Sequence, residues 1–312
     1  MAENDDLFGN LDSKMGFLED QKTTSVGDDG LYRVDLTKAK DKKWRSVIRF
    51  LPNLTKDGKV GQSAIEKISH YVNIKSAKEL SGFFDSPRNF NEKCPLTDLY
   101  YNLTNSKNAI LVEKAKSLQY SKKYYSYVLV LEDPRPELVG KIMIFQYGKT
   151  IKDKIAAERT GEVSSPCNVF DLSAGKDFVL LVNEIQTGDE TYPDYKKSQF
   201  KPETTPLQLY KNGEFRSVPL VDGKIDPNVQ GKVREFLLSR GHDLEEFGPK
   251  KLTEQDHAKI NDIIAFLTGK VSAPAQSTPS SNDFSFDDDL SSMSGSSKPA
   301  ATTTSTEDDF FS

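Results

Sequence analysis

Runs of β-branched and aromatic residues, mostly alternating with polar ones, recur through the first two thirds of the chain. This two-residue period is typical of strands that bury one face. Pro, Gly, Asn and Asp residues bound most of the runs, as turns between strands require. The predicted strands are residues 31–37, 46–52, 65–74, 124–134, 141–148 and 177–185.

Helical periodicity, in which apolar residues return every three or four positions, occurs between the third and fourth predicted strands, after the fifth, and near the end of the folded region. The last helix has a start signal at Thr253, with Asp256 three residues later, and a stop signal at Gly269. The predicted helices are residues 96–103, 108–119, 150–158, 227–240 and 253–269.

This order of elements predicts a mainly β protein with added helices, of the α+β class. Five or six strands interrupted by helix and followed by helix are typical of an OB-fold-like Greek-key barrel core with a helical subdomain. Local periodicity does not establish whether the sheet closes, so a twisted open sheet is the alternative.

The two ends of the chain differ in composition from its middle. Residues 271–312 are rich in Ser, Thr, Ala, Pro and Asp, and such a segment cannot bury enough apolar surface to offset the entropy of ordering it. Residues 1–30 are also acidic and predict a self-association or flexible arm. We therefore expect disordered termini around a core of residues 31–270, with an inserted subdomain at about residues 75–120 and C-terminal helices over residues 226–270.

The formal charge of −5 over 312 residues conceals a segregation of charge. Residues 1–30 and 271–312 carry −6 each, whereas residues 31–270 carry +7, and residues 31–160 alone carry +11. A basic middle between acidic ends favours a polyanion-binding surface for which the tails compete. Acidic ends that only add solubility are the alternative.

The cysteine count and the hydropathy restrict the class of protein. Cys94 and Cys167 are the only cysteines, which excludes a disulfide scaffold and fits a reducing compartment. No run of about 20 apolar residues occurs, and the acidic N-terminus lacks the apolar core of a secretory signal. A cytosolic protein is therefore expected.

Catalytic motifs are missing from the sequence. His70, His242 and His257 are scattered, and no zinc-protease, nucleophile-elbow or phosphate-binding-loop motif occurs. An enzyme is not expected, and a two-metal nuclease site is the alternative that the sequence leaves open.

Tyrosines and lysines are concentrated in the basic part of the chain. Eight of the 12 tyrosines lie between residues 71 and 147, and nine lysines interleave with them between residues 107 and 154. Single-stranded nucleic acid needs this combination, because cations follow the phosphates while flat rings stack on bases. A sheet with tyrosines in its core and lysines on its wet face is the alternative. Alternation places Tyr125 and Tyr127 on one face and Tyr124 on the other, so at most half of these rings are free to stack.

Four segments in this order resemble the single-stranded DNA-binding, or helix-destabilising, proteins of T-even-type tailed phages. They are SVIRFLP (46–52), KCPLTDLYYNL (93–103), YYSYVLVLEDP with GKIMIFQYGKTIKDKI (124–155), and DFVLLVNEIQTGDETYPDYKKSQF (177–200). That family has an N-terminal arm for cooperative self-association, an OB-fold core with a zinc-bearing subdomain, and an acidic C-terminal domain that recruits replication and recombination proteins.

The resemblance implies a DNA cleft. Arg49 would contact phosphate, and rings and lysines at matching positions would line the cleft: Tyr100, Lys122, Lys123, Tyr124, Phe145, Tyr147, Lys149, Tyr192, Tyr195, Lys196 and Lys197. In the tail, acidic and aromatic side chains predict a partner-docking peptide, because carboxylates steer toward a basic pocket while a ring anchors. Its residues are Asp287, Asp288, Asp289, Asp308, Asp309, Phe310 and Phe311.

The chain departs from the family at the zinc site. The family's zinc is held by one His and three Cys, but here Thr97 stands at the last Cys position and Ser86 or a neighbour at an earlier one. His70 and Cys94 are then an incomplete remnant of a four-coordinate site. We expect no metal and no other cofactor, with packing of Phe83, Phe84, Phe90 and Leu96 in place of zinc.

The N-terminus is a second departure, because the family's arm is basic and this one is acidic. We expect weaker cooperativity, or self-association through apolar residues of the arm: Leu7, Phe8, Leu11, Met15, Phe17 and Leu18.

These features predict a non-enzymatic phage protein that coats and protects single-stranded DNA and removes its secondary structure in DNA replication, recombination and repair. Its expected partners are single-stranded DNA, further copies of itself along the strand, and, through the tail, phage DNA polymerase, helicase loader and recombination mediator. The expected location is the cytoplasm of the infected host bacterium, without membrane association. The alternatives are an RNA-binding protein and a protein-interaction adaptor that binds no nucleic acid.

Overall fold

The computed structural model describes residues 30–36, 43–55, 57–162, 165–187 and 190–269. The chain divides into two units, residues 1–270 and 271–312, and every described residue lies in the first. The expectations for the acidic arm and for the seven docking residues of the tail therefore lie outside the described residues.

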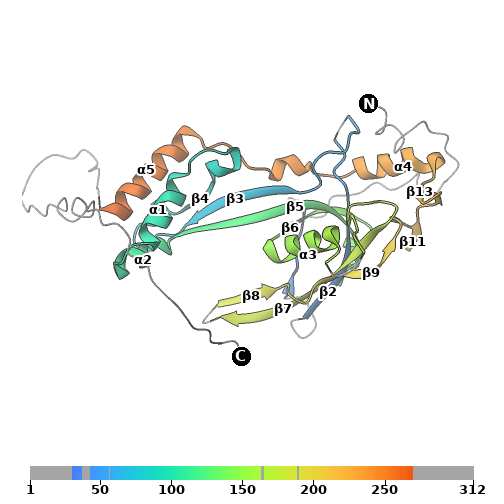
Figure 1. Ribbon diagram of the computed structural model, residues 1–312, viewed down its shortest axis with the longest axis horizontal. Helices are drawn as coiled ribbons and strands as arrows, with labels where there is room; N and C mark the ends of the chain where they lie inside the picture. Colours follow the sequence, from blue (N-terminus) through green and yellow to red (C-terminus); the bar gives the residue numbers. More distant parts are fainter. Residues whose placement is uncertain (1–29, 37–42, 56, 163–164, 188–189, 270–312) are drawn as a thin grey trace, which may run out of the picture. The chain divides into compact units, whose positions relative to one another are not determined.

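Nine strands of the described residues form one sheet (Figure 1). They are β1 (Leu31–Tyr32), β2 (Lys43–Phe50), β3 (Ile65–Val72), β4 (Gly82–Asp85), β5 (Leu118–Glu132), β6 (Ile142–Tyr147), β7 (Gly175–Thr187), β8 (Glu190–Asp194) and β9 (Gln199–Thr205). The order is β1-β6-β5-β2-β7-β8, while β3 pairs with β4 and β5, and β9 pairs with β7. β1 runs parallel to β6, and the other pairs are antiparallel.

Two hairpins and five α-helices complete the described part of the chain. The hairpins are β10 (Gln208–Lys211) with β11 (Glu214–Ser217), and β12 (Leu220–Val221) with β13 (Lys224–Ile225). The helices are α1 (Pro95–Thr104), α2 (Ala109–Ala115), α3 (Lys149–Thr160), α4 (Pro227–Leu238) and α5 (Glu254–Thr268). Short 3-10 helices are η4 (Lys78–Leu80), η5 (Pro87–Phe90), η6 (Pro136–Leu138) and η7 (Leu244–Phe247). The predicted α+β class is confirmed at this level.

The last helix starts and stops at the predicted residues. The Thr253 side chain accepts from the backbone N–H of Asp256, and the Asp256 carboxylate accepts from the backbone of Thr253, so the two form a capping box. Gly269 closes the helix in the left-handed conformation at φ 76°. The start and stop signals read from the sequence are confirmed.

β5 buries both of its faces in the second half of its length. On one face, Tyr124 and Val128 pack into an aromatic core with Phe50, Phe145 and Tyr147, and α3 joins this core through Ile151. On the other face, Tyr127 and Leu129 pack into an aliphatic core that α4 covers. The sheet therefore lies between two hydrophobic layers, as large sheets with helices on both sides do.

A third core joins the first half of β5 to helices. Val72 of β3, Phe84 of β4 and Leu118 of β5 pack with apolar residues of α1, α2 and α5. We call this part, residues 65–118 with α5, the helical subdomain. Figure 1 shows β3 and β5 as long neighbouring ribbons that run from these helices toward α3.

The start of β5 differs from the sequence expectation. The helix predicted over residues 108–119 ends at Ala115, and the strand begins at Leu118 rather than at Tyr124. The run Ser121–Lys123 is entirely polar and lacks the apolar alternation that predicts a strand. It nevertheless pairs with Lys67–Ser69 of β3 in an antiparallel ladder. None of the described helices is long and apolar enough to cross a membrane.

Candidate nucleic-acid interface

Arg49 lies inside the protein. The residue is 1% exposed, and Nη1 donates to the Asp177 carboxylate at 3.3 Å and to the Thr205 hydroxyl at 3.0 Å. Nη2 donates to the carbonyls of Asp171 and Thr205 at 2.9 and 2.8 Å. A guanidinium with these partners joins β2 to the β7 and β9 region and does not face solvent, so the predicted phosphate contact does not fit this arrangement.

Three of the predicted DNA-contacting rings belong to the aromatic core. Phe145 is 1%, Tyr147 4% and Tyr124 9% exposed. Phe145 and Tyr147 stack with centroids 5.7 Å apart, and the Tyr147 and Ser126 hydroxyls lie 3.0 Å apart. Burial raises the pKa of Tyr147 to about 12, against the hydrogen bond with Ser126. Phe145 and Tyr147 stabilise the sheet here, and the prediction that they stack on bases does not fit their burial.

The face of β5 that carries Tyr120, Lys122 and Tyr124 differs, because it leaves the core as it approaches the helical subdomain. Side chains two positions apart on a strand point to the same side, about 6.8 Å apart. Tyr120 is 44% exposed, and Lys122 Nζ lies 2.7 Å from the Glu66 carboxylate at a partly exposed position. We call this surface the β5 face. Lys123, the next residue along the strand, points to the opposite side.

Two tyrosines of α1 extend the rings at one end of the β5 face. The centroids of Tyr100 and Tyr120 are 6.2 Å apart with their planes at 74°, and those of Tyr100 and Tyr101 are 5.5 Å apart at 73°. Tyr101 is exposed and Tyr100 is partly exposed. We call these three rings the aromatic row. Tyr101 and Tyr120 were not among the predicted residues, although Tyr120 continues the alternation of Lys122 and Tyr124 and is detectable from it.

The N-terminal turn of α3 lies at the other end of the β5 face. Burial raises the pKa of Tyr124 to about 12, helped by a hydrogen bond to Glu66 and by the negative charge of Asp153 on α3. Asp153 also forms an ion pair with the exposed Lys149, and Lys152 Nζ lies 3.6 Å from the same carboxylate. Both of these lysines are thus held by carboxylates, Lys122 in the middle of the face by Glu66 and Lys149 at its α3 end by Asp153.

The remaining predicted residues lie on β8 and in the turn that follows it, and they differ in how exposed they are. Tyr192 is 45% exposed and stands opposite Ile185, which is also exposed. Tyr195 packs against the aromatic core on which α3 also packs, and burial raises its pKa. Lys196 and Lys197 are exposed in the turn before β9. Tyr192 and the two lysines are therefore accessible, whereas Tyr195 is mostly structural.

The opposite side of the subdomain strands also exposes rings. Tyr71 of β3 and Phe83 of β4 are cross-strand partners, 50% and 61% exposed. The expected packing of Phe83 in place of zinc is therefore wrong, while Phe84 and Leu96 are buried in the subdomain core as expected. Phe90 is partly buried, with Lys251 Nζ 5.6 Å from its ring centroid.

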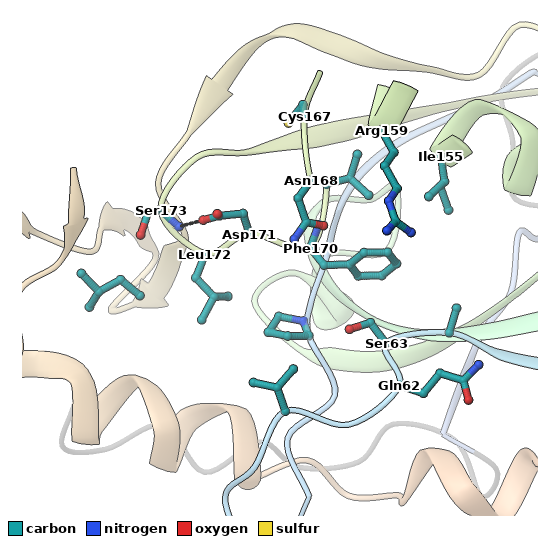
Figure 2. Close-up of a pocket in the computed structure, with 15 residues that line it drawn as sticks. Gln62, Ser63, Ile155, Arg159, Cys167, Asn168, Phe170, Asp171, Leu172 and Ser173 are labelled. Carbon is teal, nitrogen blue, oxygen red and sulfur yellow. Dashed lines mark hydrogen bonds between the residues drawn. The ribbon is translucent and has the colours of Figure 1, made fainter. Parts of the chain in front are cut away.

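A cavity of about 720 Å³ lies beside the C-terminal end of α3 (Figure 2). Its wall is mainly apolar, with Phe170, Asn168 and the exposed Arg159 among the lining residues. Cys167 also lines it, and burial raises the pKa of this thiol, which disfavours the nucleophilic thiolate. The lining residues include no histidine, and the Asp171 carboxylate among them accepts hydrogen bonds from the backbone N–H groups of Ser173 and Ala174.

Comparison with known proteins identifies relatives. A family model described as gp32 DNA binding protein like matches residues 42–263. A single-stranded DNA-binding protein of Enterobacteria phage T4 is 28% identical over 200 residues, which cover 61% of this chain and 60% of that protein. A protein of the same name from Enterobacteria phage T2 is 28% identical over 166 residues, half of each chain. The matched segments span less than two thirds of either relative.

Proposed function

The chain belongs to the family of gp32-like DNA-binding proteins, and we propose on this basis that it binds and coats single-stranded DNA. This is a family of binding proteins rather than of enzymes. A ligand that binds only the single strand shifts the duplex equilibrium toward open DNA without ATP. The protein would thereby protect single strands and remove their secondary structure during phage DNA replication, recombination and repair.

The observation that carries this proposal is the aromatic row next to lysines on the β5 face. Tyr120 and Tyr101 are exposed rings, while Lys122 in the middle of the β5 face and Lys149 at its α3 end are cations. Stacking on a ring is worth about 1–3 kcal/mol per base and tolerates any sequence. Each neutralised phosphate adds affinity that falls as salt rises.

The β7–β8 hairpin supplies further candidate contacts. Tyr192, Lys196 and Lys197 are accessible and offer the same two chemistries, a ring for a base and cations for phosphates. We include them in the proposed interface and leave out Arg49, Phe145 and Tyr147, whose side chains are buried.

The finer features expected from the family remain proposals. They are a closed OB-type barrel, cooperative coating through the acidic arm, and an acidic tail that occupies the basic surface when DNA is absent and docks replication proteins when DNA displaces it. Polymerase, helicase loader and recombination mediator are the proposed partners of the tail, and the cytoplasm of an infected bacterium is the proposed location.

A salt titration with a labelled oligonucleotide tests the proposal. Trp44, the only tryptophan, is 1% exposed, so its fluorescence is a poor reporter of surface binding. The anisotropy of fluorescein-labelled poly-dT should rise with protein and fall steeply with added salt. No binding at low salt would favour the adaptor, and preference for poly-rU over poly-dT would favour the RNA-binding alternative.

A further inference from the structure

Four small polar side chains meet in the interior of the helical subdomain. His70 lies on β3, Ser86 precedes η5, Cys94 precedes α1, and Thr97 is in the first turn of α1. His70 Nε2 lies 3.0 Å from the Thr97 hydroxyl and 3.3 Å from the Cys94 sulfur. All four are buried, at 0%, 0%, 3% and 5% exposed in chain order.

The other three side chains surround the sulfur of Cys94. His70 Nε2 lies 3.3 Å from this sulfur. Burial raises the pKa of the Cys94 thiol, but the influence of His70, Ser86 and Thr97 outweighs burial and lowers it to about 6. We call the four residues the polar node. The node ties β3, η5 and α1 together, and it adds to the hydrogen bonds that already join Asn89 of η5 to the Ile68 backbone of β3.

The family resemblance implies a zinc ion at this place, but the donor set does not fit one. Structural zinc takes four nitrogen, thiolate or carboxylate ligands. The polar node has one imidazole and one thiol, and its other two members are hydroxyls. The described residues contain no group of three or more His, Cys, Asp or Glu side chains that could hold a metal.

The hydrogen bonding of His70 is a second reason why the node does not fit a zinc ion. A metal-binding histidine almost always donates its second ring nitrogen to a carboxylate, a carbonyl or water. His70 Nδ1 is buried and has no hydrogen-bond partner among the described residues. The ring is therefore oriented by Thr97 and Cys94 rather than by an outer partner of the kind that metal sites have.

We propose that the polar node replaces the metal, so that the helical subdomain of this chain folds and holds its shape without zinc. Ser86 and Thr97 occupy the two positions at which a pair of thiolates would complete a four-coordinate site. The centroids of His70 and Tyr120 are 6.1 Å apart, so the node directly supports the aromatic row. The inference rests on the geometry of the node and not on the proposed DNA binding.

The first test is the metal content and melting of the full-length protein, purified without added metal. We expect well under one zinc per chain by mass spectrometry, and the same melting temperature with and without a zinc chelator. One zinc per chain that survives dialysis, or a melting temperature that the chelator lowers, would overturn the proposal.

The second test converts the node into a metal site. The double variant Ser86→Cys with Thr97→Cys should bind one zinc per chain, give the absorption of tetrahedral cobalt when loaded with Co²⁺, and acquire a chelator-sensitive melting temperature. The matched control is Ser76→Cys with Thr104→Cys, the same changes at exposed positions outside the node, which should stay metal-free.

A folded double variant that binds no metal would overturn the assignment of Ser86 and Thr97 to ligand positions. If that variant does not fold, Thr97→Val gives a separate measurement, because it removes the hydroxyl and nearly keeps the volume. It should lower the melting temperature by about 2–8 °C without changing the metal content. An unchanged melting temperature would contradict a stabilising role of the node.

Discussion

Tyr124 and Tyr147 face each other across the β5–β6 ladder, with ring centroids 5.7 Å apart and planes at 22°. This stacked pair marks the place where the β5 face enters the aromatic core. Beyond it the rings are buried, and before it, at Tyr120, they are exposed. Rings that stabilise the sheet and rings that are free to bind are thus only four residues apart on the same side of one strand.

Tyr120→Ala should weaken binding of single-stranded DNA with little effect on folding. Loss of one stacked base costs about 1–3 kcal/mol, which is roughly a 5- to 150-fold loss of affinity. The measurement is the dissociation constant for labelled poly-dT at constant salt. Tyr71→Ala, an equally exposed ring on the opposite side of the subdomain strands, is the matched control and should bind normally. Equal losses in both variants would remove the β5 face as the binding surface.

Arg49→Met should reduce stability and leave the salt dependence of binding unchanged. Breaking a buried ion pair costs about 3 kcal/mol or more, here reduced by Lys201, which lies 3.2 Å from the same Asp177 carboxylate. Lys122→Gln should do the reverse, with unchanged stability and a slope of log affinity against log salt that is smaller by about 0.7. Urea unfolding and salt titration measure the two quantities. A smaller slope for Arg49→Met would restore Arg49 as a phosphate contact.

Glu66→Gln should tighten DNA binding at low salt. The Glu66 carboxylate holds Lys122 and lies next to the surface that phosphates would occupy, so its charge opposes the ligand. Removing one charge of this kind should raise affinity by about two- to tenfold at low ionic strength, and the gain should vanish at high salt. Glu79→Gln, an exposed position on η4, is the control. Weaker binding by Glu66→Gln would mean that Glu66 positions Lys122 for its contact.

Deletion of residues 271–312 should increase the affinity for single strands at low salt. The deletion removes a charge of −6 that we propose competes for the basic surface. The gain should shrink as salt rises, because the tail would be attracted by the same charges as DNA. The control keeps the length of the tail and replaces all seven Asp and Glu residues of 271–312 by Asn or Gln. Unchanged affinity in both would refute competition, though not docking of partners.

Stability should fall in alkali as Tyr147 ionises. Because burial raises its folded pKa to about 12, above the value of about 10 in the unfolded chain, the folded state holds this proton more tightly. The stabilisation is complete below about pH 10 and is lost as the pH rises toward 12. Urea midpoints across this range measure it, and Tyr147→Phe should show a shallower decline. Identical declines would mean that other groups govern alkaline unfolding.

The five described α-helices and six of the thirteen described strands follow from local pattern, whereas β4, β8–β13 and the burial of individual side chains do not. Alternation correctly separated Tyr124 from Tyr125 and Tyr127, but both faces of β5 are covered there. α3 covers one side and α4 covers the other, and no pattern within β5 itself reveals either contact. Arg49 illustrates the same limit, because its partner Asp177 is 128 residues away and no local signal pairs them.

The approximate position of the polar node could be predicted from the sequence, because the family resemblance placed Thr97, and Ser86 or a neighbour, at the positions of the missing ligands. Its hydrogen bonds were not, since they depend on how η5 and α1 approach β3. The exposed rings were also missed at Tyr101 and Tyr120. Tyr101 adjoins a predicted residue on α1, and only the packing of that helix decides which ring faces solvent.

The continuity of β5 restricts how the helical subdomain can move relative to the main sheet. Leu118–Tyr125 pair with β3, and Tyr124–Leu129 pair with β6, so one unbroken backbone runs from the helical subdomain into the main sheet. At about 3.4 Å per residue its fifteen residues span roughly 50 Å. The two ladders overlap at Tyr124 and Tyr125, so tilting the subdomain would require bending the strand at or near this doubly paired step, not swinging on a loop. The continuous strand therefore restricts changes in the distance between the tyrosines of α1 and the lysines of α3, and a bound polymer would have to fit this spacing.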